Sequence, residues 1–397
     1  MSYYCKQEHW LSIADKCKPE LITINRRPIS VVRCVKDPTK FQGWVMEHLS
    51  APDTILDVLQ GRSAEFVLDF GEHIVGSLQL KIGLGEFAAD APLRLHMIFA
   101  EVPSEIGEAF EPFMGELSRA WLQDEIINLD ELPCIYTTPR RYAFRYLKIQ
   151  IKNSSKHLQV KFLDIVCQTV TSANPSHLKL AIEKLPKEWQ ELDRISIRTL
   201  ANCMQTVFED GPKRDRRLWV GDLRLQAQAN YETFNNNELV KRCLYLFAGL
   251  ADTEGKVMAD LYEKPLARKG NTYIMDYGAL FPVILYDYLK NTADRQTAID
   301  LWPVSLRQLD FITCCVNDSG LFIIPEKVWI FIDWCAPLHR QASMQAVLIY
   351  SLRKVIALAK EIGEEKSVYK LVEMVEKMKV YCKRFKLKVS SNIFEHL

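Results

Sequence analysis

The sequence has almost no net charge: 51 lysine and arginine residues stand against 50 aspartate and glutamate residues, a formal charge of +1. Without a positive excess, a protein has no general attraction for nucleic-acid phosphates or anionic membranes. The sequence also lacks an unbroken apolar run of about 18 residues, which a transmembrane helix needs. We therefore expect neither a nucleic-acid partner nor a membrane partner.

Paired cysteines are missing too. The 11 cysteines are scattered without C-x-x-C spacing, and Cys314 and Cys315 are merely adjacent. This pattern predicts free thiols and no zinc site. Glycine-rich nucleotide loops, a G-x-S-x-G elbow and an H-E-x-x-H helix are also absent, so we expect no cofactor and no metal.

The first 16 residues lack the basic region and the unbroken apolar region of a signal peptide. Free thiols persist mainly in reducing compartments. These two features predict a cytoplasmic location. A secreted or periplasmic location stays open if the native N-terminus is missing from the sequence.

The pattern of apolar residues changes near residue 175. Before it, apolar and polar residues alternate with period two, which predicts strands at residues 65–70, 77–82, 93–100, 142–152 and 158–170. Half-buried strands separated by turn residues are typical of an antiparallel sheet folded into a sandwich. We predict a β-sandwich domain over residues 1–175.

After residue 175 the periodicity becomes helical. It predicts helices at residues 188–208, 222–234, 238–251, 277–289, 294–316, 339–362 and 364–384. Pro303 is expected to kink or to begin its helix. Because no strand pattern separates these helices, we predict a domain of antiparallel helical hairpins over residues 176–397.

Residues 210–222, DGPKRDRRLWVGD, hold three carboxylates, four cations and one tryptophan. Gly211 and Pro212 predict a loop here. One interpretation is a solvated, salt-bridged loop in which Asp222 caps the next helix. The other is a sugar site, in which carboxylates bind hydroxyl pairs, the tryptophan stacks on a ring, and a protonated carboxyl serves glycoside hydrolysis. We call these residues the signature segment.

The signature segment resembles the motif D-x-P-x-R-[DE]-R-x-x-W-x-G-D of α-L-rhamnosidases, whose six-hairpin (α/α)6-barrel domain follows a β-sandwich. WIFIDW at residues 329–334 is similar to the W-x-x-x-D-W segment of that family. Residues 276–311 resemble its helical pair, and residues 66–82 and 142–151 resemble its sandwich strands. The resemblance covers most of the chain from about residue 60 onward.

The resemblance implies roles for individual residues. Asp215 stands at the position of the general acid, where the family more often has glutamate. The implied sugar-contacting or supporting residues are Asp210, Arg214, Trp219, Asp222, Asp276, Trp329, Asp333 and Trp334. Asp276 could instead cap a helix, and Trp329 and Trp334 could instead pack in the core. Asp333 lies in an apolar run, where a buried carboxylate would need a partner or a ligand.

By resemblance, the function is removal of terminal α-L-rhamnose from a rhamnose-containing glycan by an inverting acid/base mechanism. The family's base lies late in its barrel of twelve helices, and about seven helices are expected here. The resemblance therefore implies an incomplete barrel without a matching base, and exposed apolar faces that favour self-association. A non-catalytic sugar-binding protein or a degenerate, truncated homologue is the alternative. A third hypothesis is a helical scaffold that binds proteins, but a scaffold does not need the charged signature segment with its tryptophan.

Overall fold

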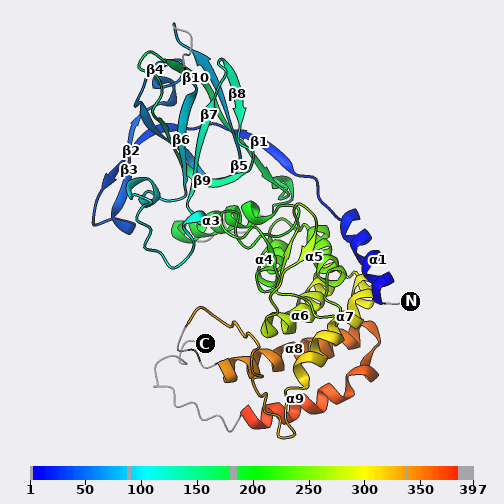
Figure 1. Cartoon of the computed structure of the whole chain (residues 1–397). Helices are drawn as coiled ribbons and strands as arrows, with labels where there is room; N and C mark the ends of the chain where they lie inside the picture. Colours follow the sequence, from blue (N-terminus) through cyan, green and yellow to red (C-terminus); the bar gives the residue numbers. More distant parts are fainter. Residues whose placement is uncertain (1–2, 87–90, 179–185, 336–337, 339, 383–397) are drawn as a thin grey trace.

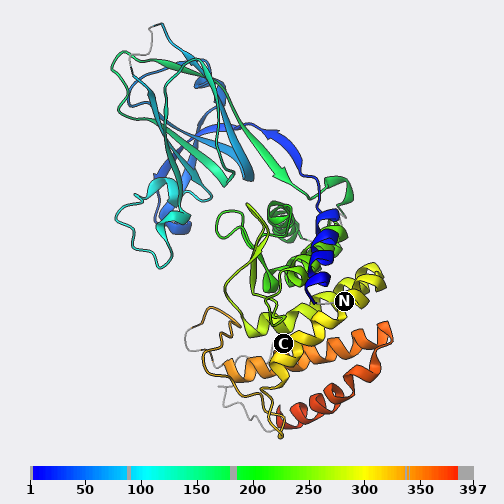
Figure 2. The ribbon, with the colours of Figure 1, turned by 45° about the vertical axis from the view of Figure 1, so that its right-hand side comes forward.

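The structure, a computed structural model, describes residues 3–86, 91–178, 186–335, 338 and 340–382. Figures 1 and 2 show two units: strands gather at one end of the molecule and helices at the other. The helix α3 (Lys187–Cys203) follows the last long strand and leads into the helical unit. The last long strand of the sheet unit ends at Thr171.

The sheet unit is built around one long strand, β5 (Glu65–Leu84), and all strand pairs within it are antiparallel. The first part of β5 pairs with β2 and β9, and its second part pairs with β8 and β10. Between these parts the register shifts after Asp69, and Gly71 takes a φ of +81° that glycine adopts without strain. The two strands predicted at residues 65–70 and 77–82 are therefore one bent strand.

Period-two alternation identified the central strands well. In β6 (Leu93–Ala100) buried and half-buried residues alternate as predicted, and the buried ones join a core with β9 (Tyr142–Ile151) and β10 (Val160–Thr171). The sequence did not predict the strands in which most residues are half-buried or exposed. These are β1 (Ile22–Arg26), β2 (Ser30–Lys36), β3 (Trp44–Ser50), β4 (Leu59–Gln60), β7 (Gln123–Leu129) and β8 (Cys134–Thr137).

The helical unit follows the predicted order. Its helices after α3 are α4 (Val220–Glu232), α5 (Asn237–Gly249), α6 (Met275–Thr292), α7 (Arg295–Thr313), α8 (Arg340–Ile362) and α9 (Tyr369–Cys382). They share one hydrophobic core, in which α6 packs against α4, α7 and α8. Pro303 lies inside α7 rather than at its start.

An N-terminal helix, α1 (Tyr3–Lys16), was not predicted and belongs with the helical unit (Figure 1). It packs on α5, and its Trp10 is buried in the helical core. Buried Arg242 donates a hydrogen bond to the carbonyl of Ala14 at 2.5 Å. The assignment of residues 1–175 to the sandwich therefore needs correction, because the first helix lies in the other unit.

Helix α8 is long and apolar enough to resemble a membrane span in length and composition. The sequence analysis, which looked for an unbroken apolar run, did not single out this helix. One face of α8 is buried in the helical core through Met344, Leu348, Leu352 and Val355. That burial is what a core helix of a folded domain shows.

Candidate active site

The signature segment forms a closed loop that leads directly into α4. The backbone N–H of Asp210 donates to the carbonyl of Arg217 at 2.9 Å, and the Asp210 Oδ1 accepts the N–H of Arg217 at 3.1 Å. The short strand β11 (Leu218–Trp219) then pairs with β12 (Asp260–Tyr262). These bonds fix where the carboxylates of the segment lie.

The structure corrects the expected role of Asp222. Pairing of β11 keeps Trp219 extended, so α4 begins at Val220 and Trp219 occupies the capping position, without a side-chain hydrogen bond. Asp222 consequently lies in the first turn of α4. A carboxylate there interacts favourably with the helix dipole, but it does not cap the helix.

A cavity of about 610 Å³ opens beside the signature segment. Seven of the nine predicted site residues line it, Asp276 and Asp333 being the exceptions. Its lining consists of Glu116, Leu117, Trp121, Asp210, Arg214, Asp215, Arg217, Trp219, Asp222, Ile274, Tyr277, Trp329, Phe331 and Trp334. The first three of these come from the sandwich unit, so both units build the cavity.

Asp210, Asp215 and Asp222 form a carboxylate cluster in this cavity. Burial, the largest cause, raises the pKa of Asp210 to about 7. The charges of Asp215 and Asp222 also raise this pKa, whereas the hydrogen bond from the backbone N–H of Arg217 lowers it. Burial also raises the pKa of Asp222, with Arg214 opposing and Asp215 adding to the effect. Desolvation, with repulsion between the carboxylates added to it, thus raises the pKa values of Asp210 and Asp222.

Two further buried carboxylates support the segment and were not predicted. Asp260 on β12 accepts a charged hydrogen bond from Arg217 at 3.2 Å, although burial still raises its pKa. Glu209 pairs with Arg141, which immediately precedes β9 of the sandwich. Burial outweighs Arg141 and raises the pKa of Glu209. The only sequence signal for Asp260 is its place in an apolar run.

A wall of aromatic rings lies beside the carboxylate cluster. Trp219 contacts Tyr277 edge to face with centroids 6.3 Å apart, Tyr277 contacts Phe331 at 5.9 Å, and Phe331 contacts Trp334 at 5.2 Å. The Nε1 atom of Trp219 is buried without a hydrogen-bond partner. Tyr277 and Phe331 were missed because only tertiary packing places them here. The wall offers ring faces to a ligand.

Asp276 does not line this cavity, and its side chain is buried. Its carboxylate accepts the backbone N–H of Phe331 at 2.9 Å and that of Ile332 at 3.1 Å. The helix α6 begins at Met275 with Ile274 in the capping position, so Asp276 is not the helix cap that was considered. Its observed contacts position Phe331 in the aromatic wall.

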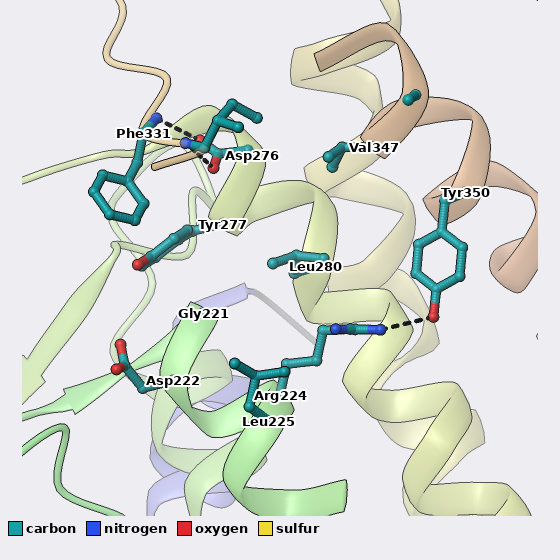
Figure 3. Close-up of a pocket in the computed structure, with 12 residues that line it drawn as sticks. Gly221, Asp222, Arg224, Leu225, Asp276, Tyr277, Leu280, Phe331, Val347 and Tyr350 are labelled. Atoms are coloured by element: carbon teal, nitrogen blue, oxygen red, sulfur yellow. Dashed lines mark hydrogen bonds between the residues drawn. The ribbon is translucent and has the colours of Figure 1, made fainter. Parts of the chain in front are cut away.

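A second cavity, of about 600 Å³, lies between α4, α6 and α8. Asp276, Asp222 and Tyr277 are among the residues that line it (Figure 3). Asp333 lines neither cavity and is exposed, so it is not the buried carboxylate that was expected. Its Oδ1 accepts the N–H of Trp334 at 2.7 Å. The structure therefore does not bring Asp276 and Asp333 into the first cavity with the other predicted residues.

The sandwich also holds the signature segment through Lys213. Its ammonium group forms ion pairs with Glu105 and, at 3.3 Å, with Glu101. Glu101 also contacts His73 at 2.8 Å. Within the described ranges, no group of three or more histidine, cysteine or acidic side chains is arranged to hold a metal ion. The chemistry of the cavity is that of carboxylates, arginines and aromatic rings.

Two family descriptions match the chain. Residues 186–386 match the bacterial α-L-rhamnosidase six-hairpin glycosidase domain, and residues 28–169 match the glycosyl hydrolase family 78 α-rhamnosidase N-terminal domain. The chain belongs to the bacterial α-L-rhamnosidase family. The resemblance and the order of a sheet domain followed by a helical domain are thereby confirmed.

Solved rhamnosidase structures agree with this family. A rhamnosidase from Klebsiella oxytoca with rhamnose bound is 38% identical, with a TM-score of 0.90 over 94% of this chain and 72% of that one. A family 78 rhamnosidase of Bacillus sp. GL1 shares the fold at 22% identity, with a TM-score of 0.69 over 86% of this chain and 35% of that one. Comparison with curated proteins gives no match. Family membership supports a glycoside hydrolase that acts on rhamnose.

Proposed function

We propose that this rhamnosidase homologue hydrolyses terminal α-L-rhamnosides with inversion, and that Asp215 is the general acid. The observation that carries the proposal is the single cavity in which the carboxylate cluster lies beside the aromatic wall. Rhamnose presents hydroxyl groups to acceptors and donors and an apolar ring face to aromatic side chains. The cavity offers both kinds of contact.

The general acid must carry a proton when substrate binds. Burial raises the pKa of Asp210, in the same cluster, to about 7, so this cavity can hold a protonated carboxyl near neutrality. In the proposed mechanism, Asp215 donates a proton to the leaving oxygen while Asp210 and Asp222 hold the sugar hydroxyls.

An inverting enzyme needs a second carboxylate roughly 6.5–9.5 Å from the acid, with room for a water molecule between them. Among the described residues that line the first cavity, Glu116 of the sandwich is the one carboxylate outside the cluster, but its side chain is exposed. Glu326, a competitor for this role by its place before WIFIDW, is also exposed and lines neither cavity. We therefore assign the base to neither residue.

The experiment is hydrolysis of an aryl α-L-rhamnoside by the full chain and by Asp215→Asn. We expect kcat to fall at least 10²-fold in the variant, the scale on which general acids contribute. Asp53→Asn is the control, because this exposed aspartate of the sandwich lines neither cavity. NMR of the first-formed sugar anomer tests inversion. Unchanged turnover in Asp215→Asn would remove Asp215 from the mechanism.

A sugar-binding protein without turnover is distinguished by calorimetry with free rhamnose. Measurable rhamnose affinity without hydrolysis of any aryl glycoside would support binding alone. Absence of both would contradict the proposed function. The chain spans 72% of the Klebsiella enzyme, so the activity of that whole protein is carried to this chain only as a proposal.

A further inference from the structure

We propose that the sandwich unit builds the subsite for the leaving group, and that this subsite selects a flat, apolar aglycone through Trp121 and Leu117. The proposal rests on the proposed function, because it places the scissile bond beside the carboxylate cluster. It concerns five residues of the cavity, which we call the rim: Glu116, Leu117, Trp121, Trp329 and Trp334.

The first argument is the separation of polar and apolar groups within one cavity. The charged side chains Asp210, Arg214, Asp215, Arg217 and Asp222 all come from the signature segment. The rim, in contrast, contains three tryptophans, one leucine and a single charged side chain. The terminal sugar therefore finds its hydrogen-bonding partners at the signature segment, and a second group of the substrate meets mainly apolar surface.

The second argument is exposure. Trp334 is 78% exposed, Leu117 56% and Trp329 43%. Large apolar side chains that stay exposed around one opening mark a surface for an apolar ligand. A second sugar at the rim would need several hydrogen-bonding groups, and Glu116 is the one charged side chain there. Indole faces stack well on flat aromatic rings.

The third argument is preorganisation of the sandwich side of the rim. Trp121 is the last residue of the short helix η3 (Arg119–Trp121). Ser118 caps this helix, because its side chain accepts a hydrogen bond from the N–H of Ala120. Arg119 forms two hydrogen bonds with Asp124, at 2.7 and 3.1 Å. Half-buried Trp121 is thus held in place before a ligand arrives, which lowers the entropic cost of binding.

The size of the cavity agrees with two groups rather than one. A volume of about 610 Å³ lies within the range of roughly 300–1,000 Å³ found for sites that enclose drug-sized ligands. A rhamnose ring with an attached bicyclic aromatic group is a ligand of that class. A lone monosaccharide would leave the rim uncovered.

The test is binding of two probes to the full chain carrying Asp215→Asn, which slows hydrolysis during the measurement. The probes are 4-methylumbelliferyl α-L-rhamnoside and methyl α-L-rhamnoside, which differ only in the aglycone. We expect the aryl probe to bind at least tenfold more tightly. Trp121→Ala and Leu117→Asp should abolish this preference without changing the affinity for the methyl probe. Trp121→Phe should retain most of it. Met114→Ala is the matched control, because Met114 is 89% exposed in the same segment and does not line the cavity.

Equal affinities for the two probes in the Asp215→Asn chain, or equal losses for both when the rim substitutions are added to it, would overturn the inference. So would binding of neither probe, which would also contradict the proposed function. Aryl preference without turnover would support the inference while the catalytic proposal fails. Leu117→Asp guards against misfolding of Trp121→Ala, because Leu117 is exposed and its replacement leaves the core intact.

Discussion

Asp210→Asn should stabilise the protein, and the gain should grow with pH. The pKa of Asp210 rises from 3.8 to about 7 on folding, a difference of about 3 pH units. At about 1.4 kcal/mol per unit this corresponds to about 4 kcal/mol. The side chain is partly exposed and screened by solvent, so we expect about 2 kcal/mol.

The sign follows from the direction of the change in pKa. Well below pH 3.8, the ordinary pKa of this carboxyl, Asp210 is protonated in both states and its ionisation has no effect on stability. As the pH rises toward 7, the unfolded chain ionises while the folded chain retains the proton, so the wild-type protein loses stability. Asparagine cannot ionise and can keep the hydrogen bond from the Arg217 N–H, so the variant is spared this loss.

The assay is guanidinium unfolding, followed by circular dichroism of the helices, at about pH 4.5 and about pH 8. The free energy of unfolding of Asp210→Asn relative to wild type should be about +0.5 kcal/mol at the lower pH, which already exceeds the ordinary pKa of 3.8, and about +2 kcal/mol at the higher one. Asp53→Asn, at an exposed position in the sandwich, is the control. A difference between variant and wild type that stays constant over this range would refute the electrostatic description of the cluster.

Three further predictions follow from single contacts. Arg141→Ala leaves Glu209 buried without its cation, so it should lower the free energy of unfolding by about 3 kcal/mol. Adding Glu209→Gln to this variant should restore part of that free energy. A loss below about 1 kcal/mol in Arg141→Ala would contradict the prediction. Gly221→Ala places a Cβ 2.5 Å from the Tyr277 ring and should weaken rhamnose binding measured by calorimetry, whereas unchanged affinity would show that the ring can move freely. Leu225, 65% exposed beside the second cavity, should promote self-association, so Leu225→Asp should shift light scattering toward the monomer; a wild-type chain already monomeric at high concentration would refute that role.

The sequence predicted features that depend on local pattern. Alternation identified β6 and β9, whose buried residues face one core, and helical periodicity identified α3 to α9 to within a few residues except where the chain leaves a helix early. The signature segment was also accessible, because Asp210, Asp215 and Asp222 lie within 13 consecutive residues whose loop is closed by bonds between Asp210 and Arg217. Geometry of this kind depends on residues that are close in the sequence, so a local pattern can predict it.

Features that depend on distant partners were missed. The strand β1 has mostly exposed side chains and is held by pairing with β10, far along the chain. The helix α1 has little amphipathic pattern of its own and is defined by packing on α5. Asp276 lies one residue before Tyr277, yet the first binds backbone amides while the second faces the cavity. Sequence spacing alone could not distinguish these roles.

The rim illustrates the same limit at the level of function. Trp121 and Leu117 precede the signature segment by about 90 residues and belong to no motif, so only the folded structure places them beside Asp215. The ion pairs of Lys213 with Glu101 and Glu105 and of Glu209 with Arg141 join the same two units. Because these contacts fix the signature segment to the sandwich, a change in the sandwich can alter both the position of the acid and the surface that meets the leaving group. The two effects separate experimentally: loss of the ion pairs should lower kcat for every rhamnoside, whereas loss of Trp121 should act on the aryl probe alone.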